Sequence, residues 1–458
     1  MKRLLVLVLL IATAAFALER QPNADYRARR EALAKKAGGT IILVFAGIEK
    51  GAVEELTGFR QDENFYYLTG VNEPGAAVLI APAIEAKKPD EPSAPTATGN
   101  RPAPATGERP APTPRPYSEV LLLPRHNLAR ERWDGKKLGP DDPDAASATG
   151  FERVVPLDRL YDELTKVAPN GGGLLVNQGP TAQVAVDWLK ATNLAIHTRD
   201  VKPLLTSLRM VKDAGEIALI RKATDASAAA HLAAMKAMKP GMGERQISAL
   251  MQYEFERRGC ERPAYGPIVG AGFNSTVLHY DADSGPINDG DVVVMDVAGE
   301  YSGYASDITR TLPASGHFTP RQREIYDIVL GAQQAAIAAF KAGKSVLGGL
   351  DNPDSLQKAA YDYLNSHGAD LQGKPLGKYF IHGVGHHVGL DVHDPGEPGT
   401  PLDKGMVFTL EPGIYIPEEK LGVRVEDIFW VDGSGNLVRL SDPLPRTAED
   451  VEKMMSGR

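Results

Sequence analysis

The hydrophobic pattern divides the chain into two parts with different predicted architectures. In residues 18–200, the short apolar runs "TIILVFA", "NFYYLTG", "AAVLIA", "EVLLLP" and "GLLVN" predict buried strands. The polar stretch "YRARREALAKKAG" (26–38) has the composition of a surface helix. Strands that alternate with helical stretches indicate an α/β domain.

A proline-rich stretch interrupts this pattern. Residues 82–116 contain ten Pro and two copies of "RPAP". This composition favours an extended, solvated segment over a packed core. Because the stretch lies between two strand-like runs, we interpret it as a long insertion at the tip of a hairpin.

The pattern of residues 201–458 differs from that of the first part. It opens with helical periodicity in "DAGEIALIRKATDASAAAHLAAMKAM", where His231 is expected on a helix face. Strand-like "DVVVMDVAGEYSGYASDITRTL", a further helix and several strands punctuated by Gly and Pro follow. This order predicts an α+β domain in which helices cover a mostly antiparallel sheet.

The N-terminus predicts export. "MKRLLVLVLLIATAAFALER" has a basic start, an apolar run and small residues that end at Ala17, which is typical of a signal peptide covering residues 1–17. We therefore expect a periplasmic or secreted protein. The apolar run is too short to span a bilayer, so no membrane association is expected after cleavage, and an uncleaved anchor is the alternative.

Composition narrows the function classes. The chain is 43% hydrophobic and 24% charged, as in globular proteins. The net charge of -8 and the lack of a long basic run argue against nucleic acid as a partner. Cys260 is the single cysteine, so no internal disulfide can form, and no motif supports it as a nucleophile.

Four of the ten histidines lie in "HGVGHHVGLDVHD" (382–394). His382 and His386 have the spacing of a helical zinc site, but Gly383 replaces the glutamate of that motif. Each glycine in the stretch would cost a helix about 1 kcal/mol. We therefore expect extended backbone, which leaves both histidines on one face and allows close approach of backbone or ligand.

Four carboxylates stand where apolar runs end or where strands alternate. Asp296 directly follows the apolar run "VVVM", Glu411 directly follows "MVFTL", and Glu426 lies in the alternating pattern "GVRVEDIFWV". A four-residue loop at 300–303 would pair Asp296 with Asp307 across a hairpin. Buried carboxylates that close repel each other unless a cation lies between them.

These residue types predict the metal. Four carboxylates with one imidazole suit Mn²⁺, Mg²⁺, Co²⁺ or Fe²⁺ better than zinc. Four negative charges match two divalent cations, and paired cations support hydrolysis. We expect two divalent ions, with Mn²⁺ the first choice.

The order Asp296, Asp307, His386, Glu411, Glu426, together with "LEPG" and "RVED", resembles the five ligands of the pita-bread dinuclear metallopeptidases. "FRQDENFYYLTGVNEPGAAVLI" and "RERWDGKKLGP" resemble the N-terminal domain of the aminopeptidase P family. The resemblance implies an α/β N-terminal domain at 18–200, followed by an α+β pita-bread (creatinase/aminopeptidase) catalytic domain at 201–458.

The resemblance also implies metal ligands. Asp296 and Asp307 would bind one cation, and His386 and Glu411 the other. Asp307 and Glu426 would bridge the pair.

Catalytic and substrate-binding roles follow from the same resemblance. Glu411 would transfer a proton, and His279 would support substrate and proton transfer. His382 and His393 would contact the scissile peptide and the proline side. Arg424 would lie beside the acids, and His387 would have no ligand role.

The implied activity is metal-dependent release of the first residue from peptides whose second residue is proline, by a dimer or tetramer. The alternative is an Xaa-Pro dipeptidase (prolidase), which shares fold and ligands. Methionine aminopeptidase is a less favoured alternative, because it does not need the N-terminal domain that this chain has. Metal-free creatinase-like enzymes and ligand-free pseudoenzymes both conflict with five filled ligand positions.

Overall fold

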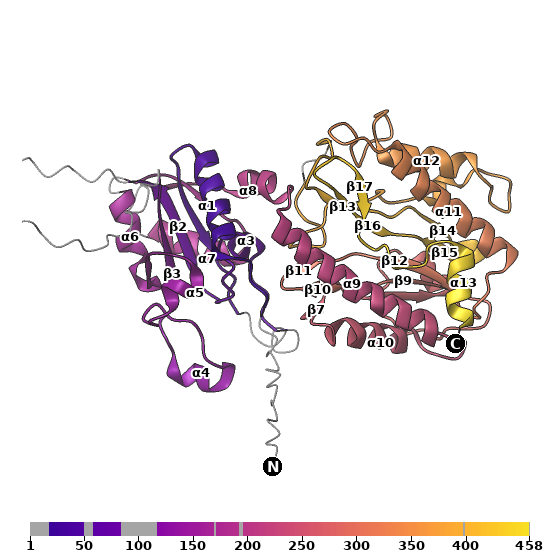
Figure 1. Cartoon of the computed structure of the whole chain (residues 1–458), viewed down its shortest axis with the longest axis horizontal. Helices are drawn as coiled ribbons and strands as arrows, with labels where there is room; N and C mark the ends of the chain where they lie inside the picture. Colours follow the sequence, from indigo (N-terminus) through magenta and orange to yellow (C-terminus); the bar gives the residue numbers. More distant parts are fainter. Residues whose placement is uncertain are drawn as a thin grey trace, which may run out of the picture. The chain divides into compact units, whose positions relative to one another are not determined.

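The structure is a computed structural model, shown in Figure 1. It describes residues 18–49, 58–83, 117–168, 171–191, 196–396 and 399–457. Two compact units form: Pro22–Leu205, and Thr206–Arg458 together with residues 18–21. The predicted signal peptide and nearly all of the proline-rich insertion lie outside the described residues.

The N-terminal unit is built on a six-stranded sheet with the strand order β4-β3-β2-β1-β5-β6. The strands are β1 (Ile41–Phe45), β2 (Ala77–Pro82), β3 (Tyr117–Leu123), β4 (Val154–Pro156), β5 (Gly172–Val176) and β6 (Ile196–Asp200). β1, β2 and β3 pair antiparallel, whereas β5 and β6 continue the sheet in parallel from β1, and β4 runs parallel to β3.

Helices cover both faces of this sheet. The helices of the unit are α1 (Asn23–Ala37), α3 (Glu63–Thr69), α4 (Leu128–Asp134), α5 (Ala145–Thr149), α6 (Leu160–Val167), α7 (Pro180–Ala191) and α8 (Lys202–Arg209), and α1, α3, α6 and α7 contact the strands. Leu43 and Phe45 of β1 pack in one core with residues of α6 and α7. Ile42 and Val44 point to the opposite face by strand alternation, where α1 and α3 contact the sheet.

The sequence prediction for "NFYYLTG" is wrong, because this segment is helix α3. The Asp62 side chain caps the helix by accepting from Phe65 N, and Gly70 ends it in the left-handed region at φ 60°. All residues from Phe65 to Leu68 are buried. A short apolar run without alternation does not distinguish a buried helix from a buried strand.

The other predicted elements of this unit are confirmed. The polar stretch is α1, and the remaining four apolar runs lie in β1, β2, β3 and β5. β2 and β3 pair antiparallel up to Pro82 opposite Tyr117. The insertion therefore departs from and returns to a hairpin, as predicted.

The C-terminal unit places antiparallel strands between pairs of helices (Figure 1). The helices are α9 (Ala214–Ala237), α10 (Glu244–Glu256), α11 (Pro320–Ala339), α12 (Leu356–Ser366) and α13 (Ala448–Ser456). The strands are β7 (Arg262–Pro263), β8 (Ile268–Ala271), β9 (Val292–Asp296), β10 (Gly299–Tyr301), β11 (Tyr304–Ala305), β12 (Thr309–Pro313), β13 (Val407–Leu410), β14 (Gly413–Ile416), β15 (Leu421–Arg424), β16 (Asp427–Val431) and β17 (Leu437–Arg439). Short 3-10 turns η2 (Gly272–Thr276), η3 (Leu376–Tyr379) and η4 (Pro417–Glu419) complete it.

This arrangement confirms the predicted α+β architecture. Each strand pair named in this unit is antiparallel. One large apolar core joins α9, α10, α11 and α12 to the strands.

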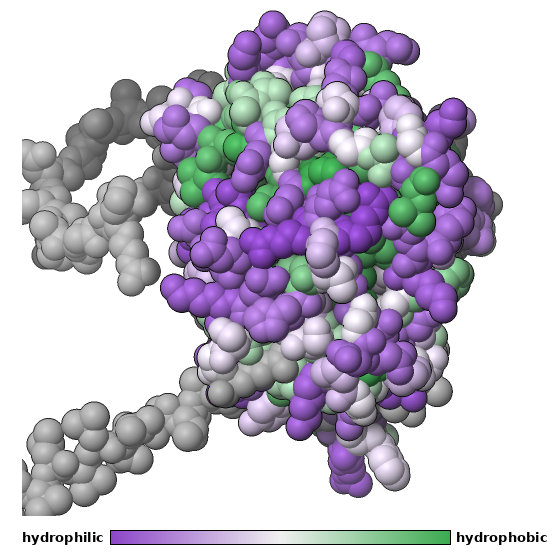
Figure 2. Space-filling model, turned by 90° about the vertical axis from the view of Figure 1, so that its right-hand side faces the viewer, coloured by the Kyte–Doolittle hydropathy of each residue, from purple (hydrophilic) through white to green (hydrophobic). Residues whose placement is uncertain are grey.

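Hydrophilic and hydrophobic side chains are interspersed on the face shown in Figure 2. Among the described residues, none of the helices has the length and apolarity needed to cross a bilayer.

The predicted hairpin register around Asp296 is wrong. Tyr301 pairs with Tyr304, so the turn contains only Ser302 and Gly303, with φ 51° and 81°. Two consecutive residues with positive φ are typical of a two-residue hairpin turn. Asp296 consequently lies opposite Thr309 on β12, and Asp307 lies between β11 and β12.

Candidate metal centre

One cavity of the C-terminal unit, with a volume of about 520 Å³, collects the residues predicted to bind metal. Its lining includes Asp296, Asp307, His386, Glu411 and Glu426. The three histidines predicted to handle substrate line the same cavity: His279, His382 and His393. The structure therefore brings together every site residue that the sequence predicted.

Strand ends aim the carboxylates at this cavity. Asp296 ends β9, Glu411 directly follows β13, and Glu426 lies between β15 and β16. The residues before them, Met295, Leu410 and Val425, are fully buried, so each chain segment is fixed in the core up to its acid.

The ligand atoms are close enough to share cations. One ligand atom each from Asp307, His386 and Glu426 lie within 4.8 Å of one another. His386 Nε2 is 3.2 Å from Asp307 Oδ2 and 3.4 Å from Glu411 Oε1. An imidazole nitrogen surrounded by carboxylate oxygens is a donor set that divalent cations bind.

Unsatisfied polar atoms in the described structure support this assignment. Oδ1 of Asp296 and Oδ1 of Asp307 are buried and have no hydrogen-bond partner there. The nearby Tyr265 hydroxyl lowers the pKa of Asp296, which burial raises, but it lies outside hydrogen-bond geometry and so does not satisfy Oδ1. His386 Nδ1 lies 3.1 Å from the carbonyl oxygen of His387, which places the proton on Nδ1 and leaves Nε2 available as a ligand. The residues present therefore fit a divalent metal site.

Electrostatics point the same way. Burial raises the pKa of Glu411 to about 7, and it raises the pKa values of Asp296 and Glu426 as well. Burial lowers the pKa of His386, but the hydrogen bond and charge of Asp307 and the charge of Glu411 outweigh it and raise that pKa to about 9. Without cations the cluster retains protons to offset its negative charge.

A second layer of side chains orients the acids. Arg424 donates to Asp296 Oδ2 at 2.7 Å and to the Tyr415 hydroxyl at 2.8 Å, which confirms its predicted place beside the acids. Thr309 donates to Glu426 at 2.6 Å and Thr409 to Glu411 at 3.3 Å.

Tyr415, Thr309 and Thr409 contact the site but were not predicted from the sequence. The correct hairpin register would have placed Thr309 opposite Asp296. Strand alternation after Glu411 would have placed Gly413 and Tyr415 on one face. Thr409 lies on β13 two residues before Glu411, which directly follows the strand, so alternation of extended backbone would have placed both on one face.

The substrate histidines sit in different environments. His382 Nε2 lies 2.9 Å from the Tyr415 hydroxyl, and burial, with the Arg424 charge, lowers the pKa of His382 to about 4. The ring of His393 lies edge-on to His386, with 4.1 Å between ring centroids. His279 is exposed at the cavity wall.

A buried ion cluster around Asp394 holds the chain directly after His393. Asp394 accepts from Arg209 Nη2 at 2.6 Å and from Lys212 Nζ at 2.9 Å, and the side chains of all three are at most 5% exposed. Both cations lower the pKa of Asp394, although burial alone would raise it. His387, just outside the cavity lining, is buried, and burial with the Lys212 charge lowers its pKa to about 4.

The backbone from His382 to His386 is irregular rather than helical, which confirms the rejection of a helical zinc motif; a regular strand does not form either. Gly385 packs directly against β13. A Cβ atom at this position would lie 2.0 Å from the carbonyl oxygen of Thr409. This glycine serves close backbone approach, as the sequence predicted.

Two other residues considered in the sequence have structural roles. Cys260 is buried, and burial raises the pKa of its thiol to about 12, so it is unsuited to nucleophilic chemistry. His231 is fully buried on α9, with Nε2 3.0 Å from the Val297 carbonyl oxygen, and burial lowers its pKa to about 4.

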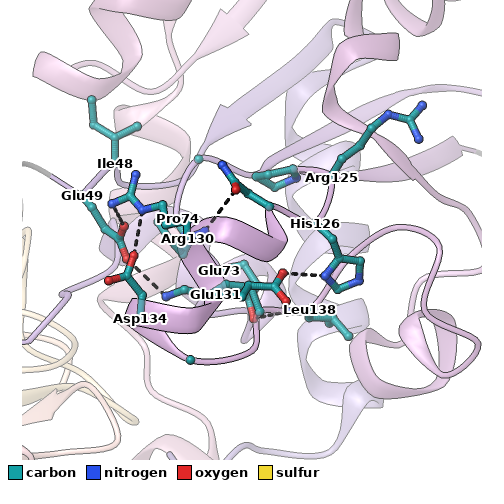
Figure 3. A pocket seen from close by; sticks show the side chains of 15 residues that line it. Ile48, Glu49, Glu73, Pro74, Arg125, His126, Arg130, Glu131, Asp134 and Leu138 are labelled. Carbon is teal, nitrogen blue, oxygen red and sulfur yellow. Dashed lines mark hydrogen bonds and ion pairs between the residues drawn. The ribbon is translucent and has the colours of Figure 1, made fainter.

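A second cavity, of about 380 Å³, lies in the N-terminal unit beside α4 (Figure 3). Arg130 pairs there with Glu49 at 2.5 Å and with Asp134 at 2.8 Å. His126 Nδ1 lies 2.7 Å from Glu131 Oε1. These charges satisfy one another, which is typical of a surface ion-pair network.

Buried acids and the His386 imidazole, held at converging strand ends of an α+β unit, form the kind of site that metal-dependent hydrolases use. Residues 218–433 match the model of Metallopeptidase family M24, and residues 26–174 match that of the Aminopeptidase P, N-terminal domain. The predicted fold class, an α/β domain followed by a pita-bread domain, is confirmed by both matches and by the solved structure described next.

Individual relatives distinguish between the aminopeptidases and the dipeptidases within this class of metallopeptidase. The chain is 31% identical to the Xaa-Pro aminopeptidase of Haemophilus influenzae, over 95% of this chain and 98% of the relative. The solved structure of proline aminopeptidase P II from Yersinia pestis superposes with a TM-score of 0.77 at 30% identity, covering 96% of this chain and all of that one. The Xaa-Pro dipeptidase of Pyrococcus furiosus is 34% identical, but over only 60% of this chain and 76% of its own length. The chain belongs to the Xaa-Pro aminopeptidase (aminopeptidase P) family.

Proposed function

We propose that the chain is a metal-dependent Xaa-Pro aminopeptidase that releases the first residue from peptides with proline in second position. The observation that carries the proposal is the convergence of five ligand side chains and three histidines on one cavity. The match to relatives along nearly the whole chain supports the peptidase activity, because the N-terminal domain is included.

The proposed cofactor is a pair of divalent cations, with Mn²⁺ the first choice for an oxygen-rich site with a single imidazole. Asp296, Asp307, His386, Glu411 and Glu426 would hold the cations. When bound, such cations make water a nucleophile near neutral pH and stabilise negative charge on a carbonyl oxygen.

The residues of the chain divide the remaining work. Glu411 takes the proton of the attacking water and passes it to the departing proline nitrogen, a role that suits a carboxyl group at the cavity wall. That nitrogen belongs to a tertiary amide without N–H, so the site needs no acceptor for it. His279, His382 and His393 hold the peptide around the scissile bond, and His393 or His279 faces the developing oxyanion.

The test uses Glu411→Gln with a tripeptide that carries proline in second position and with added Mn²⁺. We expect a loss of at least about 100-fold in kcat, as for other removed proton-transfer groups. Glu418→Gln, an exposed neighbour, is the matched control and keeps wild-type turnover. Wild-type turnover by pure Glu411→Gln would refute the proposed role of Glu411.

Chelation and addition of single metals test the cofactor separately from the residue. We expect the wild-type protein to lose tripeptide cleavage on chelation and to recover a higher rate with added Mn²⁺ than with added Zn²⁺. Recovery with Zn²⁺ alone would refute the choice of manganese.

Xaa-Pro dipeptidase activity is the alternative function, supported by the partial similarity to the Pyrococcus furiosus enzyme. Comparing kcat/KM for an Xaa-Pro dipeptide and an Xaa-Pro tripeptide separates the two. A strong preference for the tripeptide supports the aminopeptidase, and cleavage of the dipeptide alone supports the alternative.

We also propose that residues 1–17 are a signal peptide that directs export to the periplasm or beyond, and that the mature enzyme is a dimer or tetramer. The residue types of 1–17 support the first proposal. N-terminal sequencing of protein from fractionated cells tests it, because the mature chain would begin at Leu18. Light scattering of the purified protein tests the oligomeric state.

A further inference from the structure

Glu244, the first residue of α10, is a fully buried carboxylate in the C-terminal unit. Its Oε1 accepts from Ala271 N at 2.8 Å and from Asn274 Nδ2 at 2.9 Å. Its Oε2 accepts from the Tyr280 hydroxyl at 2.9 Å and from Gly285 N at 2.5 Å. Four donors offset the cost of burying the charge.

All four donors belong to one segment, residues 271–285, which carries His279. The segment starts at the end of β8, the strand that pairs with β9 and lies opposite Asp296 at Ile268. It also returns to α10, because a Cβ atom on Gly285 would lie 2.9 Å from Glu244 Oε2. Glu244 therefore closes this segment at both ends and near its middle.

His279 itself lacks such an anchor. Within the part of the chain that the structure describes, its ring makes no hydrogen bond or ion pair, and it is exposed at the cavity wall. The neighbouring residue Tyr280 is fixed through its hydroxyl to Glu244. The position of the His279 ring is thus set by the backbone that Glu244 holds.

A generic structural role would not require this arrangement. A carboxylate in the first turn stabilises a helix by its charge, but an exposed one does so without the cost of burial. The four donors to the Glu244 carboxylate instead all belong to residues 271–285, the segment that carries His279. We propose that Glu244 is a positioning residue that holds His279 at the reacting peptide, an inference that depends on the substrate role proposed for His279.

Glu244→Gln tests the proposal, because the amide nitrogen cannot accept a hydrogen bond and two donors lose their partner. We expect kcat/KM for an Xaa-Pro tripeptide to fall about 10–100-fold, a range found when groups that orient functional residues are removed. Metal content per folded chain stays at the wild-type value. Glu256→Gln, an exposed glutamate at the other end of α10, is the matched control and leaves kcat/KM unchanged.

A double-mutant cycle separates positioning from a general structural effect. If Glu244 acts through His279, then Glu244→Gln lowers kcat/KM less than about threefold in a His279→Ala background, because coupled residues are non-additive. Full additivity of the two losses would overturn the positioning proposal. If Glu244→Gln yields no folded protein, Tyr280→Phe enters the same cycle, since it removes one donor and keeps the carboxylate.

Failure of the positioning proposal is distinguishable from failure of the proposed function. A His279→Ala variant as active as the wild type would refute the role of His279, and the positioning proposal with it. A clear His279→Ala defect with an additive Glu244→Gln loss would refute positioning alone. Absence of tripeptide cleavage by the metal-loaded wild type would refute the proposed function before either variant is compared.

Discussion

Removal of the cations leaves a protein whose stability falls as pH rises. In the cation-free site, burial raises the pKa of Glu411 from its ordinary 4.5 to about 7. For His386, burial acts downward, but the hydrogen bond and charge of Asp307, with the Glu411 charge, raise the pKa from 6.5 to about 9. Both groups therefore bind protons more tightly in the folded chain than in the unfolded chain.

The sign and size of the effect follow from linkage. A group whose pKa is raised on folding stabilises the protein most at low pH, and this contribution is lost as pH rises through the folded pKa. Between pH 6 and pH 8 this amounts to about 1 kcal/mol for Glu411 and about 2 kcal/mol for His386. Because the two groups attract each other, their protonation is linked, and we expect a total loss of about 1–3 kcal/mol.

Differential scanning calorimetry of chelated protein at pH 6, 7 and 8 measures this loss. Each kcal/mol lowers the melting temperature of a unit of this size by about 2–4 °C. Protein reloaded with Mn²⁺ is expected to show a smaller decline, because cations take the place of protons. Chelated Glu411→Gln should also decline less, which assigns part of the effect to this carboxyl group. A melting temperature of verified metal-free protein that is constant or higher at pH 8 would refute the reasoning.

Three further predictions concern single residues. Gly385→Ala should sharply reduce metal content and tripeptide cleavage, because the new methyl group would lie 2.0 Å from the Thr409 carbonyl oxygen; normal metal analysis would contradict this. Asp394→Asn should destabilise folding by about 3–5 kcal/mol in urea titrations, because it leaves Lys212 buried without its counter-charge, and an unchanged midpoint would count against it. Cys260 should react with thiol reagents only after denaturation, since its pKa of about 12 and its burial keep it protonated; rapid labelling of native protein would disprove that.

The metal site could be predicted from the sequence because each acid ends a segment that the core fixes. A charge directly after an apolar run must be paired or bind a cation, whatever the exact strand register is. The incorrect register around Asp296 therefore did not affect the choice of ligands. It did hide Thr309, whose hydrogen bond to Glu426 depends on which residues face each other across β9 and β12.

Other features depend on three-dimensional packing that local patterns do not encode. "NFYYLTG" forms a helix because the Asp62 cap and the left-handed Gly70 set its limits, whereas its apolar residues suit a strand equally well. Glu244 gives no signal in the sequence, because acids are common in the first turn of surface helices as well. Its four partners lie 27 to 41 residues away along the chain and meet it only after folding.

The hairpin of β2 and β3 has a consequence for how this chain can change. Pro82 and Tyr117 are cross-strand partners, so the two ends of the 34 intervening residues, 83–116, emerge side by side from a completed ladder. The sheet consequently imposes no length on what joins them. Lineages could lengthen, shorten or rewrite that connection without a penalty in the core, and an engineer could replace it with a tight turn or an affinity tag at the same point.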